Sequence, residues 1–142
     1  ISDGASALVL TRESKLNGRA PLAKIVGHST HSIHPSDFTL APIGAIEKLL
    51  AKTGWDLASV DLFEINEAFA MVTMLTISQL KLDPAKVNIF GGACAQGHPI
   101  GSTGSRLIVT LAHAMQNQDR KRGIAALCIG GGEATAVALE RD

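Results

Sequence analysis

Three groups of polar or reactive side chains interrupt apolar stretches of this sequence, and each could take part in catalysis. They are Asn66 with Glu67, His98 with Pro99, and Cys128. Each group comes at or after the end of an apolar run that is typical of a strand. Open α/β sheets bind ligands beyond the carboxyl ends of their strands. We therefore expect these side chains to meet in one crevice if the strands are parallel.

His98 lies in a glycine-rich stretch and is the sharpest of the three signals. Pro99 disfavours the helical conformation for the residue before it, which holds the backbone of His98 extended. Gly97 and Gly101 leave room for a ligand or a neighbouring backbone. An imidazole held in this way can act as an acid, a base or a hydrogen-bond donor. The alternative is a histidine that only closes a turn.

Cys128 and Asn66 are weaker signals, because each also has a purely structural explanation. Three glycines at 130–132 follow Cys128, and their backbone N–H groups could form a donor pocket for a developing oxyanion. A lone cysteine in an apolar strand is nevertheless more often a small buried core residue. Asn66 could orient a water molecule or a substrate carbonyl, or it could cap the helix expected over 68–80.

Two further patterns do not need a ligand to explain them. His28, His31 and His34 are spaced like a ligand series. In an extended segment His31 would point away from the other two, so a polar surface loop is favoured over a metal site. The stretch at 97–106 lacks the spacing of nucleotide-binding glycine loops. We therefore expect no metal and no nucleotide.

Composition limits the possible partners. The 13 basic and 13 acidic residues cancel, and the only basic run is at 120–122, so nothing indicates binding to nucleic acid or a membrane. The two cysteines are too few for a disulfide framework, and no leader or long apolar span is present. These features favour small-molecule chemistry in a reducing, cytoplasmic setting. The start at Ile1, without a methionine, favours a fragment of a longer protein.

Apolar runs between glycines and prolines predict alternating strands and helices. Strands are expected over 5–10, 22–27, 60–65, 87–90, 124–129 and 135–140; helices are expected from Pro42 to near Gly54, over 68–80, and around Leu107, Leu111 and Met115. This alternation favours an α/β fold with a mostly parallel sheet between helices, in which the last two strands are antiparallel neighbours. One boundary is expected near 18–21.

Three segments, in this order, resemble the C-terminal signature blocks of thiolases. They are Asn-Glu-Ala-Phe at 66–69, the glycine-rich stretch at 91–93 with Gly-His-Pro-Ile-Gly at 97–101, and Cys-Ile-Gly-Gly-Gly at 128–132. The resemblance implies a thiolase-like C-terminal domain, with a mixed five-stranded sheet covered by helices on both faces. It also implies that residues 1–20 are the tail of the N-terminal half and that 21–142 form the C-terminal domain. The nucleophilic cysteine would then lie in the missing N-terminal part.

The resemblance also implies roles for four residues. His98 would activate the missing cysteine and donate to the thioester oxygen, and Asn66 would hold a water molecule at the same oxygen. Cys128 would be the acid/base that moves a proton to and from the α-carbon of the acetyl group. The backbone N–H of Gly130 would contribute to a second oxyanion hole.

The implied activity is that of an acyltransferase, an acetyl-CoA C-acetyltransferase. Acetyl-CoA, acetoacetyl-CoA and CoA would be substrates in lipid metabolism, with no separate cofactor, and the intact protein would be a homo-oligomer, a dimer or a tetramer. The alternatives are a 3-ketoacyl-CoA thiolase of fatty-acid β-oxidation and a non-catalytic thiolase-like domain. A ketoacyl synthase is disfavoured, since those families favour a histidine where Asn66 stands.

Overall fold

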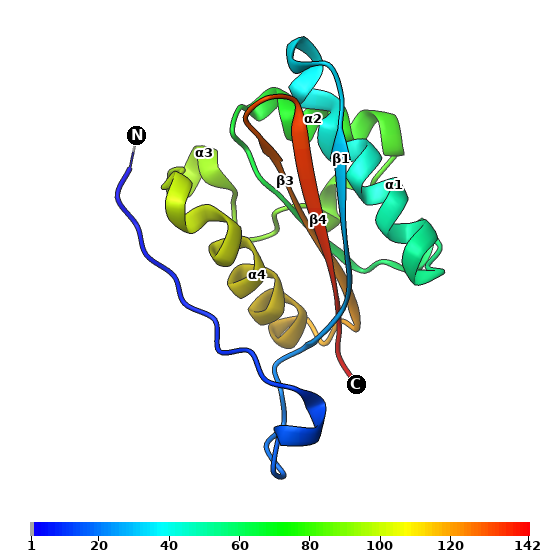
Figure 1. The fold of residues 1–142 in the computed structure, drawn as a ribbon, viewed down its shortest axis with the longest axis vertical. Coiled ribbons are helices and arrows are strands. Elements are labelled where there is room, and N and C mark those ends of the chain that lie inside the picture. Colours follow the sequence, from blue (N-terminus) through cyan, green and yellow to red (C-terminus); the bar gives the residue numbers. More distant parts are fainter. Residues whose placement is uncertain (1) are drawn as a thin grey trace.

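The computed structural model describes residues 2–142, which form a four-stranded sheet with helices on both faces (Figure 1). In chain order the elements are β1 (Lys24–Ser32), α1 (Ala41–Thr53), β2 (Leu62–Ile65), α2 (Ala70–Leu80), α3 (Ala93–Gln96), α4 (Ile100–Asn117), β3 (Arg122–Ile129) and β4 (Glu133–Glu140). The first and second helices lie on one side of the sheet, and α4 lies on the other. The predicted α/β class is confirmed.

The sheet is mixed, and its strand order is β1-β4-β3-β2. Only β2 and β3 are parallel; β4 is antiparallel to both of its neighbours. The predicted antiparallel pairing of the last two strands is therefore confirmed, but the prediction of a mostly parallel sheet is wrong. The reason is that β4 lies between β1 and β3 and runs opposite to both. In the tight turn after β3, Gly131 and Gly132 have positive φ angles of 84° and 87°. Glycine adopts these angles without a steric penalty, so the chain reverses directly.

The prediction of a fifth strand in this sheet is wrong. The run at 87–90 makes only one bridge, between Val87 and Phe63. Asn88 then takes a left-handed φ of 49°, which ends the extended backbone. Its side-chain amide replaces a strand neighbour: Oδ1 accepts from the N–H of Ile65 at 2.8 Å, and Nδ2 donates to the carbonyl of Ile65 at 2.9 Å. The sheet edge is thus closed by one side chain.

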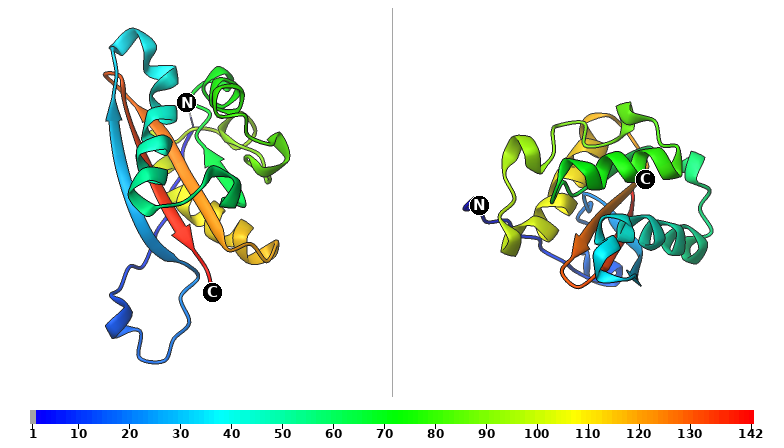
Figure 2. Two further views of the ribbon diagram at one scale, coloured as in Figure 1. Left: turned by 90° about the vertical axis from the view of Figure 1, so that its right-hand side faces the viewer. Right: turned by 90° about the horizontal axis from the view of Figure 1, so that it is seen from above.

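The N-terminal segment does not form the strand expected over 5–10. In Figure 1 it runs beside α4, where Gly4 lies against Pro99 and the hydroxyl of Ser6 donates to the carbonyl of Ser102 at 3.0 Å. Val9 is 98% exposed. Figure 2 shows the following turn projecting beyond the end of the sheet. An apolar run becomes a strand only where a neighbouring strand is present to pair with it. Ile1 lies outside the described residues.

Two apolar layers hold the sheet in place. On one face Ile46 and Leu49 of α1 are fully buried, and on the other Leu111 and Met115 of α4 are fully buried. Each such side chain contributes about 1.5–3 kcal/mol when it leaves water. Gly123 of β3 has no side chain, which lets Leu111 and Met115 of α4 pack closely on this strand. These layers fix the ends of β2 and β3.

Candidate active site

The carboxyl ends of β2 and β3 form the edge at which the sequence-predicted residues gather. Ile65 pairs with Ala126 in the parallel register, and the backbone N–H of Asn66 donates to the carbonyl of Ala126 at 2.9 Å. Cys128 lies two residues further along β3. The parallel pair therefore directs Asn66 and Cys128 toward the same edge of the sheet, as expected.

His98 meets Asn66 at this edge. The distance between Nε2 of His98 and Nδ2 of Asn66 is 3.5 Å, the upper limit for a hydrogen bond. Asn66 is 1% exposed, and its Oδ1 is buried without a hydrogen-bond partner in residues 2–142. It is not the cap of α2, because that helix begins after Phe69 and has no side-chain cap. The capping alternative is therefore wrong, and a buried acceptor remains free beside the imidazole.

Thr103 fixes the tautomer of His98. The hydroxyl of Thr103 donates its only proton to the carbonyl of Pro99 at 3.0 Å, and it lies 2.7 Å from Nδ1 of His98. With that proton on the carbonyl of Pro99, the hydroxyl accepts from Nδ1–H, which leaves a lone pair on Nε2 of the neutral ring. The helix α4 begins at Ile100, so its first turn brings Thr103 back under the imidazole.

The surroundings of His98 favour its neutral form. Burial lowers the pKa of His98, and the nearby guanidinium of Arg106 lowers it further. Arg106 also donates to the carbonyl of Gly97 at 2.6 Å and so holds the backbone before the histidine. At neutral pH the ring is therefore uncharged, with Nε2 able to accept a proton.

Cys128 and Gly130 are not bonded to the Asn66–His98 pair within the part of the chain that the structure describes. Cys128 is a free, half-buried thiol opposite Ala134 of β4, and burial raises its pKa. The thiol is therefore protonated at neutral pH. Gly130 opens the turn after β3, and a Cβ atom added to it would meet open space. The strand register places Cys128 at the same edge as the pair, and Gly130 follows the end of β3 directly.

Glu64 is a buried carboxyl group that the sequence analysis did not single out. It is 2% exposed on β2, and burial raises its pKa to about 8, against the opposing effect of Arg106. Glu64 therefore carries its proton at neutral pH. Its signal in the sequence was an acidic residue inside the apolar run at 60–65.

Thr103, Arg106 and Glu67 hold the loop around His98. The sequence pattern grouped Glu67 with Asn66, but it did not predict this holding role for any of the three residues. Thr103 and Arg106 carry a weak signal, because each follows His98 within about two helical turns. The carboxylate of Glu67 accepts from the backbone N–H of Cys94 at 2.9 Å, across 27 residues of sequence. No local spacing could have indicated that contact.

The remaining histidines and cysteine do not form a site. His28 and His31 lie on β1, and Nδ1 of His34 accepts from the backbone N–H of Ser36 at 3.3 Å. No three His, Cys, Asp or Glu side chains in residues 2–142 are arranged to hold a metal ion. Cys94 is an exposed free thiol, and a hydrogen bond with the neighbouring Glu67 raises its pKa. It forms no disulfide with Cys128.

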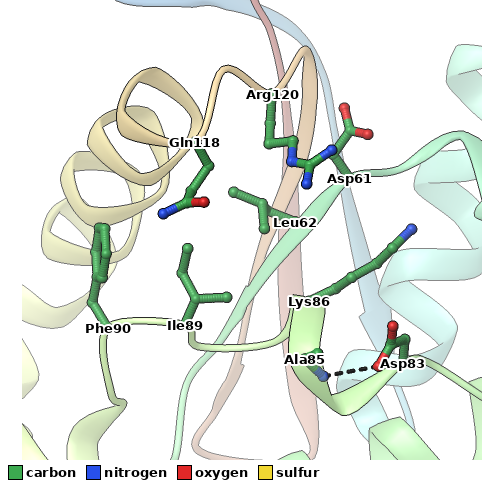
Figure 3. A pocket seen from close by; sticks show the side chains of 9 residues that line it. All are labelled: Asp61, Leu62, Asp83, Ala85, Lys86, Ile89, Phe90, Gln118 and Arg120. Carbon is green, nitrogen blue, oxygen red and sulfur yellow. Dashed lines mark hydrogen bonds between the residues drawn. The ribbon is translucent and has the colours of Figure 1, made fainter.

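A hollow lies at the opposite, amino end of β2 and β3 (Figure 3). It is lined by Asp61, Leu62, Asp83, Ala85, Lys86, Ile89, Phe90, Gln118 and Arg120. Its carboxylates already have internal partners: Asp61 accepts from the N–H groups of Lys121 and Arg122, and Asp83 accepts from that of Ala85. These groups stabilise turns, so the hollow is a poor candidate for catalysis.

The fold and this edge define the class of the protein. A mixed sheet between helices carries a buried asparagine and a neutral histidine at the carboxyl edge of its parallel pair. Residues 19–141 match the family model described as "Thiolase, C-terminal domain". The chain therefore belongs to the thiolase family, as the resemblance of its three motifs implied.

Relatives and solved structures agree with this family. The chain is 48% identical to the cytosolic acetyl-CoA acetyltransferase of Mus musculus, over 99% of this chain and 36% of that protein. The acetyl-CoA acetyltransferase of Bacillus anthracis superposes with a TM-score of 0.88 and 43% identity, covering 90% of this chain and 33% of that one. Human mitochondrial 3-ketoacyl-CoA thiolase superposes with a TM-score of 0.88 and 38% sequence identity, covering 92% of this chain and 33% of that one. The chain thus spans about a third of the length of these proteins.

No helix in residues 2–142 is both long and apolar enough to cross a membrane.

Proposed function

We propose that the intact protein is an acetyl-CoA C-acetyltransferase, which condenses two molecules of acetyl-CoA to acetoacetyl-CoA and catalyses the reverse thiolysis. The pair of Asn66 and His98 carries the proposal, because it leaves a lone pair on Nε2 and a free buried acceptor on Asn66. The mouse relative, whose name states this activity, adds support. The nucleophilic cysteine belongs to the part of the protein that precedes this chain.

His98 has two successive tasks in this mechanism. Its neutral Nε2 takes the proton from the nucleophilic thiol, while Nδ1 keeps its bond to Thr103. The imidazolium then carries a proton on Nε2 and donates it as a hydrogen bond to the thioester oxygen, where negative charge develops. The amide of Asn66 holds a water molecule at the same oxygen. One ring thus activates the nucleophile and stabilises the charge that the attack creates.

Cys128 moves the second proton. In thiolysis its thiol gives a proton to the α-carbon of the departing acetyl-CoA enolate, and its raised pKa favours this protonated state. In condensation the thiolate must form first, and it then removes a proton from the α-carbon of the attacking acetyl-CoA. The backbone N–H of Gly130 donates to the oxygen of the acyl-enzyme during attack.

The proposal extends to partners and setting. The substrates are acetyl-CoA, acetoacetyl-CoA and CoA in lipid metabolism, without a resident cofactor, and residues 1–20 belong with the N-terminal half. A cytoplasmic location is supported by the mouse relative, which is named cytosolic. Assembly as a homodimer or homotetramer stays a prediction of the sequence resemblance.

A second candidate is a 3-ketoacyl-CoA thiolase of fatty-acid β-oxidation. The similarity to the human mitochondrial enzyme favours it, since the TM-score equals that of the Bacillus anthracis acetyltransferase. The two candidates share the chemistry of His98 and Cys128 and differ in the length of the acyl chain that they accept.

Thiolysis by the intact protein tests both candidates. The rate of cleavage with CoA is measured for acetoacetyl-CoA and for 3-ketoacyl-CoA substrates of increasing chain length. The proposal expects the highest kcat/KM for acetoacetyl-CoA. A preference for long chains would favour the second candidate, and no cleavage of any substrate would leave the non-catalytic domain as the explanation.

A further inference from the structure

Glu67 joins the two segments that carry the candidate catalytic pair. It directly follows Asn66, and its Oε2 accepts from the backbone N–H of Cys94 at 2.9 Å. Cys94 belongs to α3, the short helix that ends one residue before Gly97 and so leads directly to His98. The carboxylate therefore spans the gap between the loop after β2 and the loop before His98.

The other oxygen of Glu67 is held by Asn88. Nδ2 of Asn88 donates to Oε1 of Glu67 at 3.1 Å, and the same amide bonds the N–H and the carbonyl of Ile65. The end of β2 thus orients Asn88, and Asn88 orients the carboxylate. Hydrogen bonds to a carboxylate are stronger than neutral ones, so this chain of contacts is stiff.

Gly92 leaves the space in which the carboxylate lies. A Cβ atom added to Gly92 would overlap all three atoms of the carboxyl group of Glu67. Gly92 has an extended φ of −104°, so its backbone conformation does not itself require glycine. The requirement for glycine at this position comes from the carboxylate of Glu67.

We propose that Glu67 is a positioning residue for the thiolase reaction: it ties the loop of Asn66 to the loop of His98 and sets the distance between their side chains. The inference rests on the proposed function, because that function gives the distance its importance. All contacts of Glu67 described above are with this chain itself. Its loss should therefore reduce kcat and leave KM for CoA nearly unchanged.

The first test is Glu67→Gln in the intact protein. One accepting oxygen becomes an NH₂ group that faces an N–H donor, so the bond to Cys94 or to Asn88 is lost. The kcat for thiolysis of acetoacetyl-CoA should fall by about tenfold to a hundredfold, the effect of a small misplacement of catalytic groups. Glu67→Asp keeps two accepting oxygens and should recover part of the loss. Glu47→Gln, at an exposed position on α1, is the matched control.

A double-variant cycle distinguishes positioning from a general loss of stability. Gly92→Ala alone should lower kcat, because the new methyl group displaces the carboxylate of Glu67. In a Glu67→Ala background the methyl group enters vacated space, so Gly92→Ala should add little further loss. Such coupling is expected for residues in direct contact. The rates are measured together with the thermal unfolding temperature of each variant.

The outcomes separate the two proposals. Suppose that the wild type cleaves acetoacetyl-CoA and that Glu67→Gln has the wild-type kcat, or differs only in its unfolding temperature. That result would overturn the positioning role and leave the proposed function intact. Additive losses in the cycle would also overturn it. Wild-type protein without thiolase activity would overturn both proposals. If Glu67→Gln does not fold, the kcat of Glu67→Asp decides.

Discussion

The parallel strands β2 and β3 carry polar side chains at both of their ends, and the two ends use them differently. At the amino end, Asp61 accepts two backbone N–H groups and the carboxylate of Asp83 caps a turn. At the carboxyl end, Oδ1 of Asn66 has no partner in residues 2–142, and Nε2 of His98 has only a long contact. The amino end forms the hollow, whereas the carboxyl end holds a buried acceptor without a partner in residues 2–142.

This difference indicates where chemistry can occur. A polar group that already has its full set of partners gains little by meeting a substrate, whereas a buried group without one is stabilised by it. The position of the hollow alone does not indicate the carboxyl end of the strands. An unsatisfied buried acceptor beside a neutral imidazole, rather than the shape of the surface, distinguishes the candidate active site.

The largest effect is expected from Cys128→Ala in the intact protein. Removing the acid/base should lower the rate of condensation on the order of a thousandfold, while the nucleophilic cysteine can still be acylated. The two steps are measured separately, by acetoacetyl-CoA formation and by mass spectrometry of the acyl-enzyme. Cys94→Ala removes an exposed thiol and should retain condensation. Unchanged condensation in Cys128→Ala would remove Cys128 from the mechanism.

A smaller effect is expected when the partner of the histidine is removed. Thr103→Val keeps the size of the side chain but removes the acceptor for Nδ1–H of His98. Acylation should slow about tenfold, which corresponds to the loss of one buried hydrogen bond. Thr103→Ser retains the hydroxyl and should retain most of the rate. Equal rates in Thr103→Val and the wild type would mean that the tautomer is fixed by other contacts.

The pH dependence of acylation sharpens the role given to His98. Because burial and Arg106 lower its pKa below the ordinary value of 6.5, acylation should lose rate only below that pH, as the ring becomes protonated. Arg106→Gln removes one of the causes, so the acidic limb should move to higher pH. The measurement is the single-turnover acylation rate as a function of pH. A limb that does not move would show that the charge of Arg106 does not act on the histidine.

The smallest effect is expected on stability, from Glu64. Its pKa is raised from 4.5 to about 8 in the folded protein, so its contribution is complete below pH 4.5 and is lost as pH rises through about 8. The free energy of unfolding of the wild type should therefore decrease over this window, by at most a few kcal/mol. Glu64→Gln cannot ionise and should show a flatter profile in urea denaturation. Parallel profiles would mean that the carboxyl group is solvated.

Much of the fold could be predicted from local sequence signals. Gly54 was expected to end the first helix, and it does so with a left-handed φ of 69°. The apolar stripe of Leu107, Leu111 and Met115 lies on the buried side of α4. The last two strands pair as predicted. Helix ends and periodic stripes depend on near neighbours, which the sequence contains.

Strand pairing was less predictable, because it depends on residues that are distant in the chain. The runs at 5–10 and 87–90 have strand-like composition, but the first has no strand partner in residues 2–142 and the second stops at the left-handed Asn88. The pairing of β1 with β4 joins the first strand to the last, and no local signal in the sequence indicates it. Composition gives the propensity for a strand, while the sheet is decided by what lies beside it.

The candidate site likewise has a part that the sequence predicted and a part that it did not. His98, Asn66 and Cys128 stood out because each ends an apolar run, and the structure brings the first two together. The contacts that orient them were not visible, since Glu67 reaches Cys94 across 27 residues and Thr103 acts through the first turn of α4. Reactive residue types can be found in a sequence, but the groups that hold them require the fold.

The most direct test of the central claim is the rate at which the intact protein becomes acylated. Wild type and His98→Ala are mixed with acetoacetyl-CoA, quenched at short times and analysed by intact-mass spectrometry. The account predicts that the wild type gains one acetyl group on a cysteine within the first turnover, and that His98→Ala gains it at least about a hundredfold more slowly. Equal rates of acetylation in the two proteins would contradict the assignment of His98 as the base at this edge.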